Sequence, residues 1–377
     1  MFDLRRAGIA TLAFTLLLIQ GPGIGAARPQ PTVPPLIGYP PPSGLVAVIK
    51  NVPQDSSLDL SALSNPYISG VAVQIHWSDL EPAEGNPDWS KLDALFAAAQ
   101  KSKKWVQLFI FPGFFSPAWA LKGVQTDQFP LPYGPGAGTV ATLPMPWDTV
   151  YLNRWFAFVK LLSARYGQTP SFRVIAAAGP TTVSDEVTLP KNSPEALKKW
   201  KNDGYTPDKY VQAWGKAFQV YYANFPNQYI SLSVGRDANV LDLPGQGSLK
   251  FGGSQTRTAI VDEGRGHTFV LQMNDVHAGP DASGHTSKAE DQFIIGYIGQ
   301  VFTGFQMGGA MEGPVGSAKQ GAAGNPPLAL RRSIDLAMEP NKAGQHVDFV
   351  EIYEPDVVPA DMQPVLKYGA SLFKSSP

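Results

Sequence analysis

The chain has 377 residues, of which 44% are hydrophobic and 16% are charged, a composition typical of a folded protein with a large buried core. Its formal net charge of -1 does not favour binding to nucleic acid or to an anionic membrane surface. It contains no cysteine, which excludes disulfide bonds, a thiol nucleophile, a lipidated cysteine and cysteine-ligated zinc.

The first 27 residues have the pattern of a secretory signal peptide. Arg5 and Arg6 precede an apolar run over residues 7–19, and small residues follow at 23–27. The run is shorter than the roughly 20 residues that a membrane span needs, so we expect cleavage and no membrane span in the mature chain. An uncleaved anchor is the alternative. We therefore expect a secreted or periplasmic protein, with the export route left open.

Residues 28–42 are rich in proline and predict an extended linker or arm. We exclude residues 1–42 from the core and expect a single folded domain over residues 43–377.

Eight short apolar segments follow along the chain, and most of them precede a helical pattern. Continuous apolar runs of this length are typical of parallel strands buried on both faces. The segments span residues 45–49, 70–77, 105–111, 172–178, 229–234, 268–273, 303–307 and 347–353.

Stripes of apolar residues at helical spacing lie between these segments. They predict helices over residues 89–99, 152–162, 211–221, 330–338 and 362–373. The alternation predicts βαβ units, and eight of them predict an α/β protein with a (β/α)8 TIM barrel. An open doubly wound sheet is the alternative, but no GxGxxG motif follows the first strand. Long loops are expected after strand ends, at 111–148, 179–208, 235–266 and 274–290.

The segment 70–119 carries the most specific pattern in the chain. An apolar strand ends in His76 and Trp77, LEPAEG follows at 80–85, and Asp88-Trp89 precedes an amphipathic helix and a second strand. This order resembles the early repeats of secreted (β/α)8-barrel glycoside hydrolases, of the large retaining clan that includes cellulase-like and β-galactosidase-like barrels. The resemblance implies a carbohydrate substrate, an oligo- or polysaccharide, and no cofactor.

Glycoside hydrolysis usually needs two carboxyl groups that flank the scissile bond. The resemblance places the acid/base Glu after the fourth strand, where Glu186 stands, although Asp185 precedes it and the clan has Asn there. The clan's nucleophile ends the seventh strand, and this chain has no acid there before Glu312. A Glu inside an apolar strand is costly to bury without partners, so its presence suggests a use. We therefore expect Glu351 to be the nucleophile and Glu186 the acid. Glu354, Glu312 and, next to Glu186, Asp185 are the alternatives.

Further polar and aromatic residues at the predicted strand ends and loops are candidates for sugar binding. Amides that end strands six and seven could orient either a sugar hydroxyl or a catalytic carboxylate. Trp105, Trp155 and Trp214 fall on apolar stripes and are expected in the core. The residues predicted to bind substrate are His76, Trp77, Glu81, Trp119, Trp147, Asn274, Gln306, Tyr353 and Glu354.

Other functions have weaker support in the sequence. No GxSxG, GxxxxGK[ST] or HExxH motif occurs. His277 and His285, with nearby Asp275 and Asp281, match no metal-ligand spacing, so we expect no metal site. The alternative to a hydrolase is a non-catalytic carbohydrate-binding barrel of the cell envelope. A structural envelope protein that attaches through its proline-rich arm is a third possibility.

Overall fold

The computed structural model describes residues 40–50, 57–131, 136–190, 193–235, 240–242, 249–266, 268–276, 289–311 and 325–373. All of them belong to the unit Val33–Pro377. The predicted signal peptide and nearly all of the proline-rich arm lie outside the described residues, so both stay predictions. No helix in the described part of the chain is long and apolar enough to cross a membrane.

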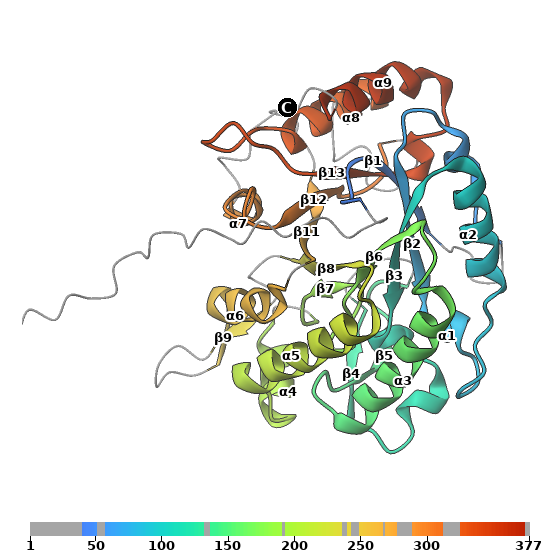
Figure 1. Ribbon diagram of the computed structural model, residues 1–377. Coiled ribbons are helices and arrows are strands. Elements are labelled where there is room, and N and C mark those ends of the chain that lie inside the picture. Colours follow the sequence, from blue (N-terminus) through green and yellow to red (C-terminus); the bar gives the residue numbers. More distant parts are fainter. Residues whose placement is uncertain are drawn as a thin grey trace, which may run out of the picture. The chain divides into compact units, whose positions relative to one another are not determined.

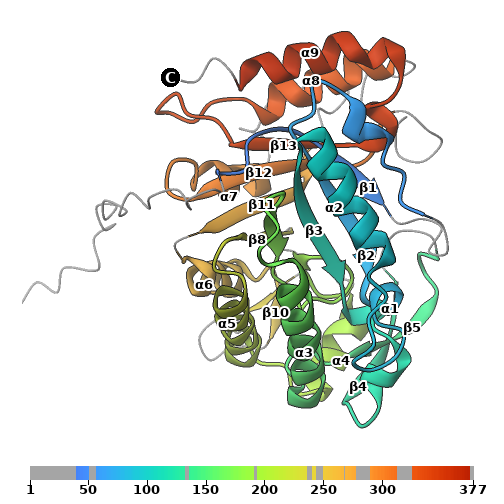
Figure 2. The ribbon, with the colours of Figure 1, turned by 45° about the vertical axis from the view of Figure 1, so that its right-hand side comes forward.

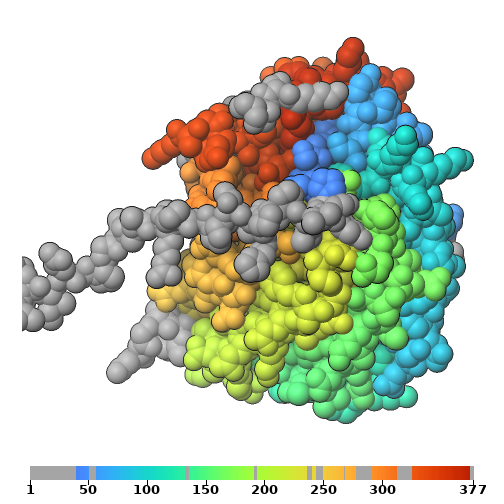
Figure 3. All heavy atoms as spheres, viewed as in Figure 1, coloured from blue at the N-terminus to red at the C-terminus, as the bar shows by residue number. Residues whose placement is uncertain are grey.

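Eight parallel strands close into a barrel, which confirms the predicted fold class (Figures 1 and 2). The last strand pairs with the first, so the early and late parts of the chain lie side by side, as the blue and red atoms do in Figure 3. Because the fifth and sixth strands also pair, an open doubly wound sheet is excluded. In barrel order the strands are β1 (Gly44–Lys50), β2 (Gly70–His76), β3 (Trp105–Phe111), β6 (Phe172–Ala176), β8 (Tyr229–Val234), β11 (Phe269–Val276), β12 (Phe302–Met307) and β13 (Phe349–Tyr353).

Helices connect most of these strands around the outside of the barrel (Figure 2). Neighbouring helices pack on one another, α5 against both α3 and α6, and α8 against α9. After β1 the connection is a 3-10 turn, Ser61–Ser64. The helices are α1 (Trp77–Leu80), α2 (Ser90–Ser102), α3 (Thr149–Tyr166), α4 (Pro194–Asn202), α5 (Pro207–Asn224), α6 (Ser254–Gly264), α7 (Ala289–Ile295), α8 (Pro326–Ala337) and α9 (Gln363–Leu372).

The five predicted helices are all present, as α2, α3, α5, α8 and α9. α6 was not predicted, because its buried face includes the polar residues Thr256 and Arg257 and shows no continuous apolar stripe. The predicted long loops also contain regular structure. They hold two hairpins, β4–β5 (Thr126–Pro130 and Val140–Pro144) and β9–β10 (Leu241–Asp242 and Lys250–Phe251), the helix α4 and the short strand β7 (Glu186–Val187).

Aromatic side chains fill the barrel toward the amino ends of its strands. Trp105 on β3 and Phe349 on β13 have ring centroids 6.1 Å apart, although β1 and β2 separate their strands in the sheet, so the rings meet across the interior. Two glycines make room for them. A Cβ at Gly70 would lie 2.4 Å from the Trp105 ring, and one at Gly304 would lie 2.2 Å from the Phe349 ring.

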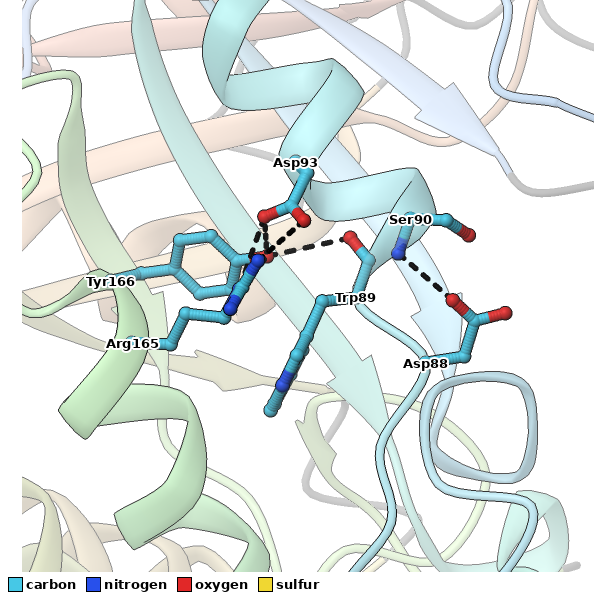
Figure 4. Close-up of polar contacts among 6 residues, drawn as sticks. All are labelled: Asp88, Trp89, Ser90, Asp93, Arg165 and Tyr166. Atoms are coloured by element: carbon cyan, nitrogen blue, oxygen red, sulfur yellow. Dashed lines mark hydrogen bonds and ion pairs between the residues drawn. The ribbon is translucent and has the colours of Figure 1, made fainter.

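The segment that carries the sequence resemblance is tied to α3 (Figure 4). Asp93 on α2 accepts hydrogen bonds from Arg165 at 2.5 Å and from the Tyr166 hydroxyl at 2.7 Å. Asp88, just before the helix, accepts one from the backbone of Ser90 at 2.9 Å. Asp88 and Asp93 therefore stabilise the start and the packing of α2, on the outside of the barrel.

We expect Gly304→Ala to lower the free energy of unfolding by about 1–3 kcal/mol, because the added methyl group overlaps the Phe349 ring in a filled interior. Urea unfolding followed by tryptophan fluorescence measures the change. Gly296→Ala is the control, since Gly296 is exposed and a Cβ there meets nothing closer than 3.4 Å. Equal stability of Gly304→Ala and wild type would mean that the interior is not tightly packed at this level.

Candidate active site

Glu351 lies in the middle of β13 with no exposed surface. One of its oxygens, Oε2, accepts two hydrogen bonds from amides on neighbouring strands. Gln272 on β11 donates at 2.8 Å and Gln306 on β12 donates at 2.6 Å. The other oxygen, Oε1, is buried and forms no hydrogen bond with any described residue. In this buried carboxyl group, one oxygen is therefore held by two hydrogen bonds, and the other has no hydrogen-bond partner among the described residues.

The two amides are themselves held by further polar side chains. Gln107 on β3 donates to Gln272 Oε1 at 2.9 Å and has Ser231 on β8 as a second partner at 3.3 Å. The hydroxyl of Tyr353 donates to Gln306 Oε1 at 2.9 Å. Since β3 and β11 are not neighbours in the sheet, the Gln107–Gln272 bond crosses the barrel interior. The result is a buried amide chain from β3 to β13.

Asp185 follows β6 and is also buried. It accepts hydrogen bonds from the hydroxyl of Ser233 on β8 and from the amide of Asn274 on β11, the latter at 3.2 and 3.3 Å. Burial raises the pKa of Asp185, although both donors oppose the change. Asp185, the alternative to Glu186, is therefore held inside the barrel by these hydrogen bonds.

Glu186 begins the short strand β7 and is half-buried. It lies in register with Ser233, whose hydroxyl faces the barrel interior at Asp185. A Cβ at Gly235, just after β8, would be 3.7 Å from its Oε2, so the carboxyl group lies beside the backbone at the end of that strand. The more accessible of the two adjacent acids is therefore Glu186.

Several carboxyl groups converge on Tyr353, at the carboxyl end of β13. Burial raises the pKa of its hydroxyl most, and nearby negative charge raises the pKa further. The groups that supply this charge are Glu351, Asp185, Glu186 and Asp275. Glu186 and Glu351 therefore lie at the same end of the barrel, the end where parallel-barrel enzymes carry their chemistry.

One described cation also reaches this end. The ammonium of Lys50, the last residue of β1, lies 4.3 Å from the centroid of the Tyr353 ring. Desolvation lowers the pKa of Lys50, although part of the residue is exposed. The ammonium contacts the ring face, whereas the hydroxyl of the same ring donates to Gln306.

The titration of Glu351 follows from this environment. Burial raises its pKa to about 8, and the charge of Asp185 raises it as well, whereas the hydrogen bonds from Gln306 and Gln272 lower it. Burial has a larger effect on the pKa than the two donors, because the free-energy cost of removing a carboxylate from water exceeds the stabilisation by hydrogen bonds from two neutral amides. At neutral pH the group is mostly protonated, and since Oε2 already accepts two N–H groups, Oε1 is the place for the proton.

Two predicted substrate ligands lie in the core instead. Trp77 has no exposed surface and packs edge-on against Trp119 and Trp155. Glu81 is 2% exposed; it accepts from Trp77 Nε1 at 2.8 Å and from the backbone of Gly85 at 2.9 Å. Their substrate-binding assignment gives way to a structural one, because the carboxylate satisfies the indole and fastens the 81–85 loop. By contrast Trp105, Trp155 and Trp214 are buried, as predicted.

The other aromatic candidates remain partly accessible. His76 is half-buried, stacks on Phe115 with ring centroids 3.9 Å apart, and has its pKa lowered by desolvation. Trp119 donates its indole N–H to the backbone of Glu81 at 2.9 Å. Trp147 packs against Tyr205, near α4. Within the described residues, no contact joins Trp147 to the carboxyl groups around Tyr353, whereas His76 is the last residue of the barrel strand β2.

The remaining predicted residues divide between the interior and the outside. Gln306 is buried and orients Glu351, the second of the two roles considered for it. Glu354, in the 3-10 turn Glu354–Asp356, accepts a hydrogen bond from the Ser61 hydroxyl at 3.0 Å. It therefore does not belong to the hydrogen-bonded residues around Glu351 in the barrel interior. Glu312 lies outside the described residues, as do His277, His285 and Asp281 of the disfavoured metal site. Among the residues that the structure describes, no group of three or more His, Cys, Asp or Glu could hold a metal ion.

Sequence reasoning missed Gln107, Ser231, Ser233 and Lys50. The first three are isolated polar residues in apolar strands, WVQLFIF and YISLSV. The cost of burying an unpaired polar group was a signal for them, as it was for Glu351. Their partners lie on strands that are distant in sequence, so the signal does not tell what each one faces.

Comparison with known proteins supports the fold. No family model matches the sequence, and no curated protein matches it. The structure is similar to the catalytic domain of a β-amylase from Paenibacillus polymyxa, with a TM-score of 0.53 and 8% identity over 89% of this chain and 100% of that chain. It is also similar to a β-galactosidase from the psychrophilic Marinomonas ef1, with a TM-score of 0.51 and 12% identity over 87% of this chain and 59% of that chain. The chain has the (β/α)8 fold of these glycoside hydrolases.

We expect Glu351→Gln to flatten the pH dependence of stability. A folded pKa of about 8 above an ordinary value of 4.5 means that the stabilisation is complete below about pH 4.5 and is lost as the pH rises through about 8. The loss in wild type amounts to at most about 1.4 kcal/mol per pH unit in this window. Urea unfolding from pH 4 to 9 measures it, with the exposed Glu84→Gln as control. Parallel curves for wild type and Glu351→Gln would contradict the buried, protonated carboxyl group.

We expect Glu81→Gln to lower the free energy of unfolding by about 1–3 kcal/mol, because an amide cannot accept from both Trp77 and Gly85 and leaves one buried donor unpaired. Thermal unfolding measures this loss, and Glu84→Gln, which is exposed, should change little. A variant of wild-type stability that binds carbohydrate more weakly would restore the substrate-binding role of Glu81.

Proposed function

We propose that the protein is a glycoside hydrolase that cleaves O-glycosidic bonds in an oligo- or polysaccharide outside the cytoplasm. The observation that supports this most is that Glu351 and Glu186 both lie near Tyr353, at the carboxyl end of β13. Hydrolysis of a glycosidic bond usually uses two such groups, one to protonate the leaving oxygen and one to attack the anomeric carbon or to activate water. The fold similarity to a β-amylase and a β-galactosidase agrees with this substrate class.

The environment of the two acids favours a division of roles opposite to the one expected from sequence. Burial keeps a proton on Glu351 at neutral pH, and a general acid needs a pKa near or above the working pH. Glu186 is more accessible and lies at a strand end, which suits a carboxylate that acts on the sugar ring. In this proposal Glu351 protonates the leaving oxygen through Oε1, and Glu186 is the nucleophile, or the base that activates water. Retention of configuration is proposed from the sequence resemblance and requires Glu186 to be the nucleophile.

A non-catalytic carbohydrate-binding barrel is the second candidate. Its support is the complete burial of Glu351, which leaves no surface for direct contact with a sugar in this conformation. Near the end of β12 the chain also has the amide Gln306, where the clan that the sequence resembles carries an acid. This candidate predicts binding of glycans without turnover.

We expect Glu186→Gln to lower kcat by about 10²–10⁴-fold on any cleaved glycan while binding is retained, because it removes the reacting carboxylate. Glu351→Gln should lose a similar factor on natural glycosides but much less on dinitrophenyl glycosides, whose leaving group needs no proton. A glycan-panel hydrolysis assay finds the substrate, and proton NMR of the first product anomer tests retention.

Glu195→Gln, an exposed change on α4, is the control for that series and should match wild type. If Glu351→Gln lowers kcat as much on the activated glycosides as on natural ones, Glu351 is the nucleophile and Glu186 the acid, as expected from the sequence. Binding without turnover by wild type across the panel would favour the non-catalytic candidate.

A further inference from the structure

We propose that Gln107 and Tyr353 are positioning residues that decide which oxygen of Glu351 carries its proton. They act through the amides of Gln272 and Gln306, and neither needs to touch a substrate. The inference deepens the proposed function, since it concerns the proton that Glu351 would donate, and it rests on that function for its role in catalysis.

The amide of Gln272 is oriented by its contact with Gln107. A glutamine amide has one face that accepts and one that donates, and it can present either to a neighbour. Gln107 donates to Oε1 of Gln272 at 2.9 Å, so the NH2 group of Gln272 turns to Glu351 and donates at 2.8 Å. A flipped Gln272 would bring two NH2 groups together at Gln107, and it would turn toward Glu351 an oxygen that can accept only from a protonated Oε2. Gln107 therefore fixes the orientation of Gln272.

The amide of Gln306 is oriented in the same way on the other side of Glu351. The hydroxyl of Tyr353 donates to Gln306 Oε1 at 2.9 Å, and Gln74 on β2 adds a long contact at 3.5 Å. The NH2 group of Gln306 then donates to Glu351 Oε2 at 2.6 Å. Tyr353 fixes Gln306 as Gln107 fixes Gln272.

Both oriented amides donate to the same atom. Oε2 of Glu351 receives two N–H groups and has no room for a proton of its own, so a proton on this carboxyl group lies on Oε1. That oxygen is buried and forms no hydrogen bond with a described residue. The chain of amides thus leaves a single O–H with no acceptor among the described residues, and a general acid needs an O–H that is free to donate to its substrate.

The orientation also affects how readily Glu351 loses its proton, because N–H donors stabilise the carboxylate. Among the described residues, Asp185 after β6 acts on Glu351, whereas Glu186 on β7, Asp275 on β11 and Lys50 of β1 lie near the neighbouring Tyr353. Of these, Asp185 acts on Glu351 directly and opposes its ionisation. Replacing Gln107 or Tyr353 changes none of these three carboxyl groups and leaves the lysine in place.

The test follows the titration of Glu351 by infrared spectroscopy on the full chain. The carbonyl stretch of the protonated carboxyl group is assigned by its loss in Glu351→Gln. In Gln107→Leu the amide of Gln272 is free to flip, and we expect the titration midpoint to rise by about one unit because one stabilising donor is lost. Tyr353→Phe keeps the ring under Lys50 and should raise the midpoint in the same direction, by less, since the Gln74 contact remains.

Ser231→Ala is the matched control. Ser231 is equally buried and contacts Gln107 at 3.3 Å, but its loss leaves the bond from Gln107 to Gln272 in place. We expect the variant to lose stability without moving the midpoint. An unchanged midpoint in both Gln107→Leu and Tyr353→Phe, or an equal shift in Ser231→Ala, overturns the proposal. If Gln107→Leu does not fold, Tyr353→Phe decides alone.

The readout does not depend on turnover, so the two proposals can fail separately. Shifted midpoints in a protein that hydrolyses no glycan would support the positioning of the proton and count against the hydrolase. Hydrolysis with unmoved midpoints would support the hydrolase and overturn the positioning. Where wild type is active, the basic limb of its pH–rate profile should shift to higher pH in Gln107→Leu and Tyr353→Phe. It should stay at the same pH in Ser231→Ala.

Discussion

Two amides that donate to one oxygen of Glu351 allow a carboxyl group to lie inside the barrel with no exposed surface. An isolated carboxylate there would be too costly, so the chain lowers the cost with hydrogen bonds and by retaining a proton. This requirement extends outward through the structure. Each amide needs a partner for its own oxygen, which explains why Gln107 and Tyr353 interrupt otherwise apolar surroundings.

The barrel interior consequently has two different halves. Toward the amino ends of the strands, aromatic rings pack over glycines and supply buried apolar surface. Toward the carboxyl ends, amides, hydroxyls and carboxyl groups replace them. This division matches the general separation in such barrels between a stabilising face and a face that carries chemistry. The raised pKa of Glu351 is a consequence of lying at the boundary, where apolar packing still excludes water.

Much of this fold was predictable because buried parallel strands have continuous apolar sequences. Even the segment 303–307, which contains Gly304, lies in a strand, β12. α6 escaped because its buried face holds Thr256 and Arg257. At the site, burial cost pointed correctly to an unusual environment for Glu351. The same kind of pattern misled at Trp77 and Glu81, because an indole paired with a carboxylate in the core has the composition of a sugar-binding wall. Gln107 could not be placed, since its partner lies 165 residues away in sequence.

The pairing of Gly70 with Trp105 and of Gly304 with Phe349 has a consequence for how this level of the barrel can vary. Each ring occupies the space that a side chain at its glycine would need, and the two rings contact each other across the interior. A larger residue at either glycine therefore requires a smaller one at the ring position, so the members of each pair can change only together.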